Sequence, residues 1–220
     1  MAAIPIGLIR VLTTSDRALL ESHGKMIEQA YPTLDITSVC LPGQPQGVFD
    51  AESEAEAAAK VPFAARTLRS LGARAIIISC AGDPGLEGAQ AEVDVPVIGA
   101  GVAAAAVALT FGLPVGVLSL TAEVPPRMAR ILGSHLLHSL CPASVRTTLD
   151  FLTPEGRAVT LQVGRTLRER GAGVICLACT GMSTAGFAPV LRRELGVPVV
   201  DPVLAAGGTA LLRLALEGLR

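Results

Sequence analysis

Two cysteines occupy equivalent positions in two similar stretches of this chain. Cys80 directly follows an apolar run, Ala75–Ser79, and Cys179 directly follows another, Val174–Ala178. The two cysteines lie 99 positions apart, and a glycine-containing turn follows each of them. A thiol has a pKa of about 8.5 when unperturbed, and its surroundings can tune it for proton transfer near working pH. Two thiols that face one cleft are therefore suited to moving a proton across a substrate carbon.

The turns behind the two cysteines offer backbone amides to a ligand. The first turn reads AGDPGL from residue 81, and the second reads TGMST from residue 180. Asp-Pro-Gly is also an ordinary turn sequence, but exposed amides in such turns hold anions or carbonyl oxygens. We expect amides from both turns to stabilise an enolate, formed when a carbon next to a carbonyl loses its proton. The predicted contacts are Ala81, Gly82, Asp83, Thr180 and Gly181.

Other motifs in the chain do not favour a metal or a cofactor. Cys176 and Cys179 form a C-x-x-C, but Cys176 falls inside a predicted strand and its side chain should face away from Cys179. His135, His138 and Cys141 recur every three residues, which we interpret as one face of a helix because no nearby residues complete a zinc site. The chain carries neither a Walker A motif nor a G-x-G-x-x-G motif. The sequence predicts no metal and no cofactor.

Composition narrows the class of protein. The chain has 220 residues, 50% of them hydrophobic, with a formal net charge of −1 and no basic patch, which argues against nucleic-acid binding. An uncharged stretch from 95 to 122 is interrupted by prolines and glycines, so we interpret it as buried strand, helix and strand rather than a membrane span. Five cysteines fit a reducing compartment and predict a cytoplasmic protein. The expected partner is a small-molecule substrate, and homo-oligomer formation stays open.

Strand and helix patterns alternate along the whole chain. Such alternation is typical of parallel sheets covered on both faces. Apolar runs predict strands at 6–12, 34–41, 75–79, 95–98, 115–120, 144–152, 174–178 and 197–200. Helical periodicity and caps predict helices at 17–31, 50–71, about 85–92, 101–109, 126–140, 154–170, 180–195 and about 204–218.

The pattern also repeats. Gly72 and Gly171, each expected to end a helix, are 99 positions apart like the two cysteines, and the Pro-Val pairs at 96 and 198 are 102 apart. We therefore predict an α/β fold of two pseudo-symmetric lobes, each a mainly parallel sheet flanked by helices, with the active site between them. The first lobe is assigned to 1–97, completed by the C-terminal helix 204–220, and the second lobe to 98–203.

The same residues resemble a known family. CAGDPGL from Cys80, followed by PVIG from Pro96, is similar to the first signature of the hydantoin racemases, and CTGM from Cys179 is similar to their second signature. These enzymes belong to the aspartate/glutamate/hydantoin racemase superfamily. The resemblance covers both halves of the chain. It implies two αβ lobes around a cofactor-independent site, with Cys80 and Cys179 as the two catalytic thiols.

The resemblance also implies a substrate. A 5-substituted hydantoin is favoured, and the loops after the first strands of the two halves would contact it through Thr13, Thr14, Ser119 and Thr121. The first of these loops reads VLTTS and lacks the Pro-Asn-Thr of hydantoin racemases, which leaves the exact substrate open. Ala-Gly follows Cys80 where relatives acting on free aspartate or glutamate carry Asn-Thr. The alternatives are an aspartate or glutamate racemase, a decarboxylase or a cis-trans isomerase of the same fold, or a two-lobed protein that binds a metabolite without turnover.

Overall fold

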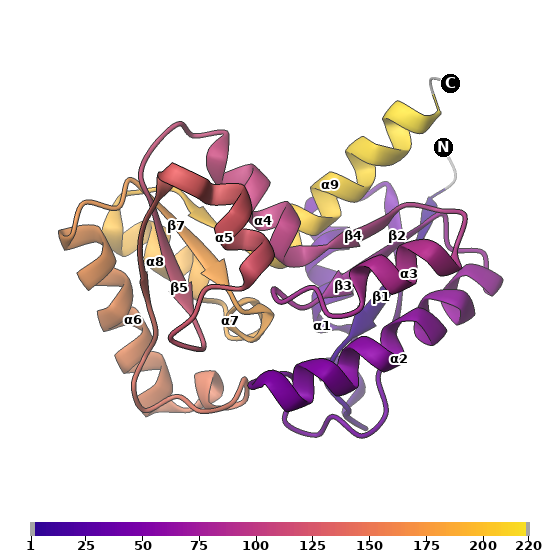
Figure 1. Ribbon diagram of the computed structural model, residues 1–220, viewed down its shortest axis with the longest axis horizontal. Coiled ribbons are helices and arrows are strands. Elements are labelled where there is room, and N and C mark those ends of the chain that lie inside the picture. Colours follow the sequence, from indigo (N-terminus) through magenta and orange to yellow (C-terminus); the bar gives the residue numbers. More distant parts are fainter. Residues whose placement is uncertain (1–2, 219–220) are drawn as a thin grey trace.

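The computed structural model describes residues 3–218 and contains two parallel sheets with helices between and around them (Figure 1). The strands are β1 Ile4–Arg10, β2 Leu34–Cys40, β3 Ala75–Ser79, β4 Val97–Gly99, β5 Val115–Ser119, β6 Leu136–Leu140, β7 Val174–Ala178 and β8 Val199–Val200. The helices are α1 Arg17–Ala30, α2 Ala51–Ser70, α3 Leu86–Glu92, α4 Ala100–Leu109, α5 Pro126–Leu132, α6 Pro154–Glu169, α7 Thr180–Thr184, α8 Phe187–Leu195 and α9 Pro202–Glu217. Two 3₁₀ turns are η1 Gly133–His135 and η2 Asp150–Leu152.

The two sheets have the same topology. Their strand orders are β2-β1-β3-β4 and β6-β5-β7-β8, and every strand pair is parallel. Gly72 and Gly171, which follow α2 and α6, both have φ near +96°, a left-handed conformation that glycine adopts without a steric penalty. The predicted fold class, two similar αβ halves with parallel sheets, is confirmed.

Alternation along the central strands explains how each sheet is covered on both faces. On β7, Val174, Cys176 and Ala178 pack into a core shared by both sheets, α4 and α9. Ile175 and Leu177 face the opposite core, beneath α6 and α8. The equivalent outer core of the first sheet lies beneath α2 and α3. Because both faces of each sheet are buried, these strands are nearly uniform apolar runs, as is typical of parallel sheets.

The last helix packs against both halves of the chain. α9 contacts α1, β3 and β4 of the first half, and α4, α7 and β7 of the second. Figure 1 shows α4 in the middle of the molecule, between the two sheets. The assignment of 1–97 with 204–220 to one lobe stays a prediction, and its last two residues lie outside the described residues.

Two segments of the second half were predicted wrongly. The predicted helix 126–140 ends at Leu132, and Leu136–Leu140 is instead the edge strand β6. Gly133, with φ of +49°, breaks the helix. His135 and His138 therefore lie on a 3₁₀ turn and a strand, not on one helical face.

The second error is the strand predicted at 144–152. This segment forms turns and η2, because the carboxylate of Asp150 accepts hydrogen bonds from the amides of Arg146 and Thr147. The helix predicted at 180–195 is divided into α7 and α8 at Gly186, which has φ of +71°. Among residues 3–218, no helix is both long and apolar enough to cross a membrane.

Candidate active site

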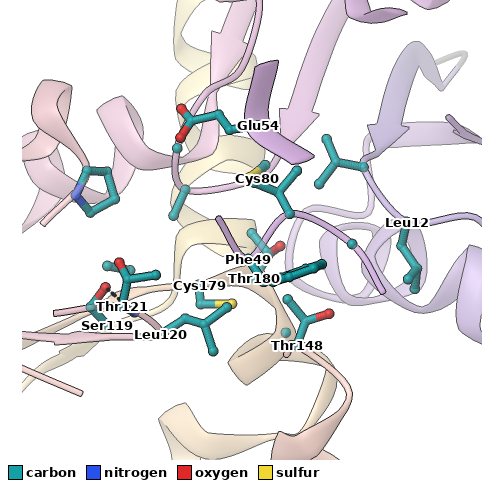
Figure 2. Close-up of a pocket in the computed structure, with 18 of the residues that line it drawn as sticks. Leu12, Phe49, Glu54, Cys80, Ser119, Leu120, Thr121, Thr148, Cys179 and Thr180 are labelled. Atoms are coloured by element: carbon teal, nitrogen blue, oxygen red, sulfur yellow. Dashed lines mark hydrogen bonds between the residues drawn. The ribbon is translucent and has the colours of Figure 1, made fainter. Parts of the chain in front are cut away.

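A cavity of about 340 Å³ opens where the carboxyl ends of the two sheets face each other. Cys80, directly after β3, and Cys179, directly after β7, both line it. Figure 2 shows the two thiols in this cavity, Cys80 from the first half of the chain and Cys179 from the second. The predicted contacts Ala81, Gly82, Ser119, Thr121, Thr180 and Gly181 line it as well.

Cys80 is held in a largely buried position. Its residue is 8% exposed, and it packs on the outer core of the first sheet with Ile76 and Ile78. Burial raises the pKa of the thiol well above its ordinary value, a hydrogen bond from the Gly82 amide partly opposes this, and the nearby Cys179, Asp83 and Glu54 raise it further. The raised pKa keeps Cys80 a neutral thiol near neutral pH.

Cys179 stands at the start of α7. It is 7% exposed, and burial raises the pKa of its thiol to about 11, while the amides of Gly181 and Met182 lower it. These amides favour the thiolate. The amides of both turns thus act on the sulfur atoms, and their expected contact with an enolate stays a prediction. Of the two thiols, Cys179 loses its proton more readily.

The loops that carry the thiols are fixed by buried carboxylates. Asp83 accepts hydrogen bonds from the α4 amides of Gly101 and Val102, at 2.9 and 2.8 Å. Its φ of +54° is rare for a residue other than glycine, and burial raises its pKa to about 7. A side chain at Gly101 would collide with the carbonyl of Ala81, so the loop needs a glycine there.

The second half has a similar arrangement, except that the carboxylate belongs to the start of the central helix and not to the thiol loop. Asp201, at the start of α9, accepts hydrogen bonds from the Ser183 hydroxyl at 2.9 Å and from the amides of Val203 and Leu204. Burial also raises the pKa of this carboxyl group. Each thiol loop is thereby tied to the first turn of a central helix, α4 or α9. Asp83, predicted to contact substrate, lies outside the cavity lining and is fully buried.

A buried histidine joins the two thiol-bearing segments. The Nδ1 of His23, on α1, lies 2.7 Å from the Ser79 hydroxyl, and its Nε2 lies 2.7 Å from the Thr184 hydroxyl. Burial and then the charge of Arg10 lower its pKa well below the ordinary value, so the ring is neutral. The Thr180 hydroxyl adds a second link, because it donates to the carbonyl of Ser79 at 3.1 Å.

The loop after β1 contributes different residues from those predicted. The Thr13 hydroxyl donates to the Leu41 carbonyl at 2.5 Å and accepts from the Gln44 amide at 2.6 Å, which ties two loops together. The Thr14 hydroxyl accepts from the Asp16 amide. Thr13 and Thr14 lie outside the cavity lining, where Val11 and Leu12 appear instead. In the second half, Ser119 and Thr121 line the cavity and their hydroxyls donate to the carbonyl of Glu123.

Several lining residues carried no signal in the sequence. Arg10 lines the cavity, but its Nη1 is committed to the α1 carbonyls of Leu19 and Leu20, and burial lowers its pKa to about 10. Thr148 lies in the segment wrongly predicted as a strand, and its hydroxyl donates to the Gln46 carbonyl across the cavity rim. Further lining side chains of this kind include Phe49, Glu54, Leu149 and Leu152. Apart from Glu54, these last side chains form an apolar wall.

The other cysteines lie away from the cavity. Cys176 is fully buried in the central core, where burial raises its pKa to about 12. It lies on the strand face opposite to Cys179, as predicted, and all five thiols are free. Within residues 3–218, no group of histidine, cysteine and carboxylate side chains has the arrangement of a metal site.

Comparisons with known proteins identify the family and the fold. The Asp/Glu/Hydantoin racemase family matches residues 6–209. The hydantoin racemase of Paenarthrobacter aurescens is 33% identical over 87% of this chain and 84% of its own. That of Pseudomonas sp. (strain NS671) is 35% identical over 61% of this chain, an alignment that spans 55% of that relative. The allantoin racemase structure from Klebsiella pneumoniae superposes with a TM-score of 0.81 at 29% identity, covering 98% of this chain and 89% of the other.

Proposed function

Because this chain belongs to the Asp/Glu/hydantoin racemase family, we propose that it is a cofactor-independent racemase or epimerase that inverts a carbon next to a carbonyl. One observation carries the proposal: Cys80 and Cys179, from equivalent strand ends of two equivalent sheets, line the same cavity. Inversion requires a base on one face of the carbon and an acid on the other. Two single-proton groups on opposite sides of a substrate meet that requirement.

The proposed reaction exchanges the protonation states of the two thiols. A thiolate removes the proton from the stereocentre and becomes a thiol, while the electron pair of the C–H bond moves into the adjacent carbonyl as an enolate. The opposite thiol then gives its proton to the other face of the carbon and becomes the thiolate. The enzyme is then poised for the reverse reaction, and a further turnover in the same direction requires proton exchange between the thiols and solvent. Backbone amides near Cys179 favour its thiolate over that of Cys80.

A 5-substituted hydantoin is the favoured substrate, and allantoin, the hydantoin with a ureido group at C5, belongs to this class. The relatives named as hydantoin and allantoin racemases support this choice. The commitment of Arg10 Nη1 to α1 also favours a neutral ring over a free amino acid, because a substrate carboxylate would need a free cation.

The proposal is tested with single enantiomers. Enantiopure alkyl and aryl hydantoins, both allantoin enantiomers and free aspartate and glutamate are incubated with the protein, and optical rotation is followed against an enzyme-free blank. We expect loss of rotation with hydantoins and none with the free amino acids. A decarboxylase would show no racemisation, and a binding protein would neither racemise the substrate nor exchange its C5 proton with D₂O. Either result would overturn the proposal.

A further inference from the structure

One acidic side chain in the cavity has no role in the proton transfer described above. Glu54 projects from the first turns of α2, and it lines the cavity together with both thiols. The start of this helix is fixed by a capping box, in which the carboxylate of Asp50 accepts from the Ser53 amide at 2.8 Å. Glu54 therefore extends from a rigid base, and Figure 2 shows it beside Cys80, on the side of the cavity away from Cys179.

The carboxylate of Glu54 lies close to the thiol loop. A Cβ added to Gly82 would stand 3.2 Å from Glu54 Oε1 and 3.8 Å from Cys80 Sγ. The absence of a side chain at Gly82 thus leaves space in which the carboxylate approaches the sulfur. A substrate placed with its stereocentre against Cys80 would lie within reach of Glu54.

The carboxylate of Glu54 forms no direct ion pair in the described part of the chain, although its charge acts on the nearby Arg127 and raises the pKa of that residue. Among residues 3–218, its carboxylate takes part in no hydrogen bond and no ion pair. The nearby Arg127 pairs with Glu87 on α3, and Arg10 is held by α1. Two other acidic residues line the cavity: the carboxylate of Asp50 is committed to capping α2, and Glu123, after β5, is exposed. Glu54 is left as a half-buried acceptor that faces the ligand space.

We infer that Glu54 determines specificity: it accepts a hydrogen bond from an N–H group of a neutral cyclic amide or ureide and repels substrates that carry a carboxylate. This inference rests on the proposed function and names a feature that its substrates share. A hydrogen bond to a charged acceptor is about twice as strong as one between neutral groups. The hydantoin ring carries two N–H groups and no charge, whereas free amino acids and ring-opened N-carbamoyl acids bring a carboxylate beside Cys80.

The first test uses alkylating agents and needs no substrate. Iodoacetamide and iodoacetate have nearly the same size, and each loses iodide when a thiolate attacks its CH₂ group, but only iodoacetate is an anion. The rate of labelling at Cys80 is measured for both reagents by peptide mass spectrometry, in the wild type, in Glu54→Gln and in Glu52→Gln. Glu52 is the matched control, because it is an exposed acidic residue in the same helical turn and lies outside the cavity lining.

We expect the ratio of iodoacetamide to iodoacetate labelling to fall about tenfold in Glu54→Gln, since one repulsive charge near the thiol is removed. The ratio should stay unchanged in Glu52→Gln. Using the ratio cancels any change in the thiol pKa, which affects both reagents alike. An unchanged ratio in Glu54→Gln, or an equal fall in both variants, would overturn the inference.

The second test measures turnover of the hydantoin that the wild type racemises best. Glu54→Gln should raise KM about fivefold to tenfold with a smaller effect on kcat, because the hydrogen bond to an ionised acceptor is replaced by a neutral one. An unchanged KM would contradict the inference while leaving the racemase proposal intact. If no hydantoin is turned over by the wild type, the racemase proposal fails, and the labelling ratio alone decides the role of Glu54.

Discussion

At the scale of single residues, the site consists of two thiols in unequal surroundings. Burial raises the pKa of both, but two amides oppose the shift at Cys179 and one at Cys80, where Asp83 and Glu54 add further increases. The thiolate therefore forms first at Cys179, where the pKa is about 11. Under the proposed mechanism, a substrate with an acidic C–H group would meet one base and one acid, rather than two equivalent groups.

The first prediction concerns the pH dependence of labelling. A thiol with a raised pKa is protonated over most of the working range, so its reactive thiolate increases tenfold per pH unit until the pKa is reached. We expect the rate of iodoacetamide labelling at Cys179 to rise log-linearly from pH 7 to 10. A model thiol such as glutathione, measured in parallel, should level off near its own pKa. A plateau at Cys179 below pH 9 would contradict the assigned environment.

The second prediction concerns Cys176, one of the three cysteines that the proposed reaction does not use. Cys176→Ala should retain near-normal turnover, because Cys176 lies in the central core on the opposite strand face.

Cys80→Ser and Cys179→Ser should each lower racemisation by several orders of magnitude with little change in the far-UV circular dichroism spectrum. Inactivation by iodoacetamide should map to Cys80 or Cys179, and substrate should protect. An inactivating label on Cys176 would place the cavity wrongly.

At the scale of elements, a small number of buried contacts hold the thiol loops in place. α1 carries His23 into the junction between the halves, where it bonds to Ser79, the residue before Cys80, and to Thr184 at the end of α7. Asp83 and Asp201 fix the same loops to α4 and α9. Positioning of the thiols thus depends in part on α4 and α9, two helices that contribute no residue to the cavity lining.

The third prediction tests the histidine link. His23→Ala leaves the Ser79 and Thr184 hydroxyls without partners, and each buried unsatisfied group costs about 1–3 kcal/mol. We expect the free energy of unfolding in urea at pH 8 to fall by about 2–5 kcal/mol and kcat to fall with it. His135→Ala is the control, since His135 is exposed and should change the unfolding free energy by less than about 0.5 kcal/mol.

The pH dependence of this loss gives a second readout. The folded protein keeps His23 neutral, so below about pH 6.5 the unfolded chain binds one proton more, and stability falls as pH falls. The penalty of His23→Ala should therefore shrink by about 1.4 kcal/mol per pH unit between pH 6 and 5. The quantity to compare is the difference in unfolding free energy between wild type and variant. Asp83 has a raised pKa and makes stability rise as pH falls in this range, and this contribution cancels in the difference. A penalty independent of pH would mean that His23 is protonated in the fold.

Most elements could be predicted from the sequence because their signals are local. Buried parallel strands such as β3 and β7 are uninterrupted apolar runs, and Gly72 and Gly171 mark helix ends by their left-handed conformation. The edge strand β6 could not be predicted, since an edge strand is half-exposed and its sequence, LLHSL, also fits a helical continuation. Only the turn at Gly133 separates α5 from it.

The candidate site was predictable in part for a similar reason. Cys80 and Cys179 were identified by their equivalent positions in the repeat. The residues directly after them were then expected to line the same cavity, as Ala81, Gly82, Thr180 and Gly181 do. Glu54, Phe49 and Thr148 come from loops and a helix that reach the cavity only through tertiary packing, so no local pattern marks them. Thr13 has the polar side chain that a contact needs, but the fold uses its hydroxyl to join two loops.

At the scale of the whole molecule, the pseudo-symmetry of the two halves explains why two thiols line the same cavity. Each half brings one cysteine to the end of the same strand of the same sheet, and the halves face each other across the cavity. The two halves also touch at the rim, where the Thr148 hydroxyl donates to the Gln46 carbonyl at 3.1 Å. A flat ring between the halves would present opposite faces to the two sulfur atoms.

The central claim is that each face of the substrate carbon has its own thiol, and isotope exchange tests it most directly. Cys80→Ser and Cys179→Ser are each incubated in D₂O with each pure enantiomer of the substrate, and loss of the C5 proton signal is followed by proton NMR. In one variant, one enantiomer should exchange its proton without inverting, and the other should exchange far more slowly. The other variant should show the mirror preference. Equal exchange of both enantiomers by a single variant would mean that one group serves both faces, and the two-thiol account would be wrong.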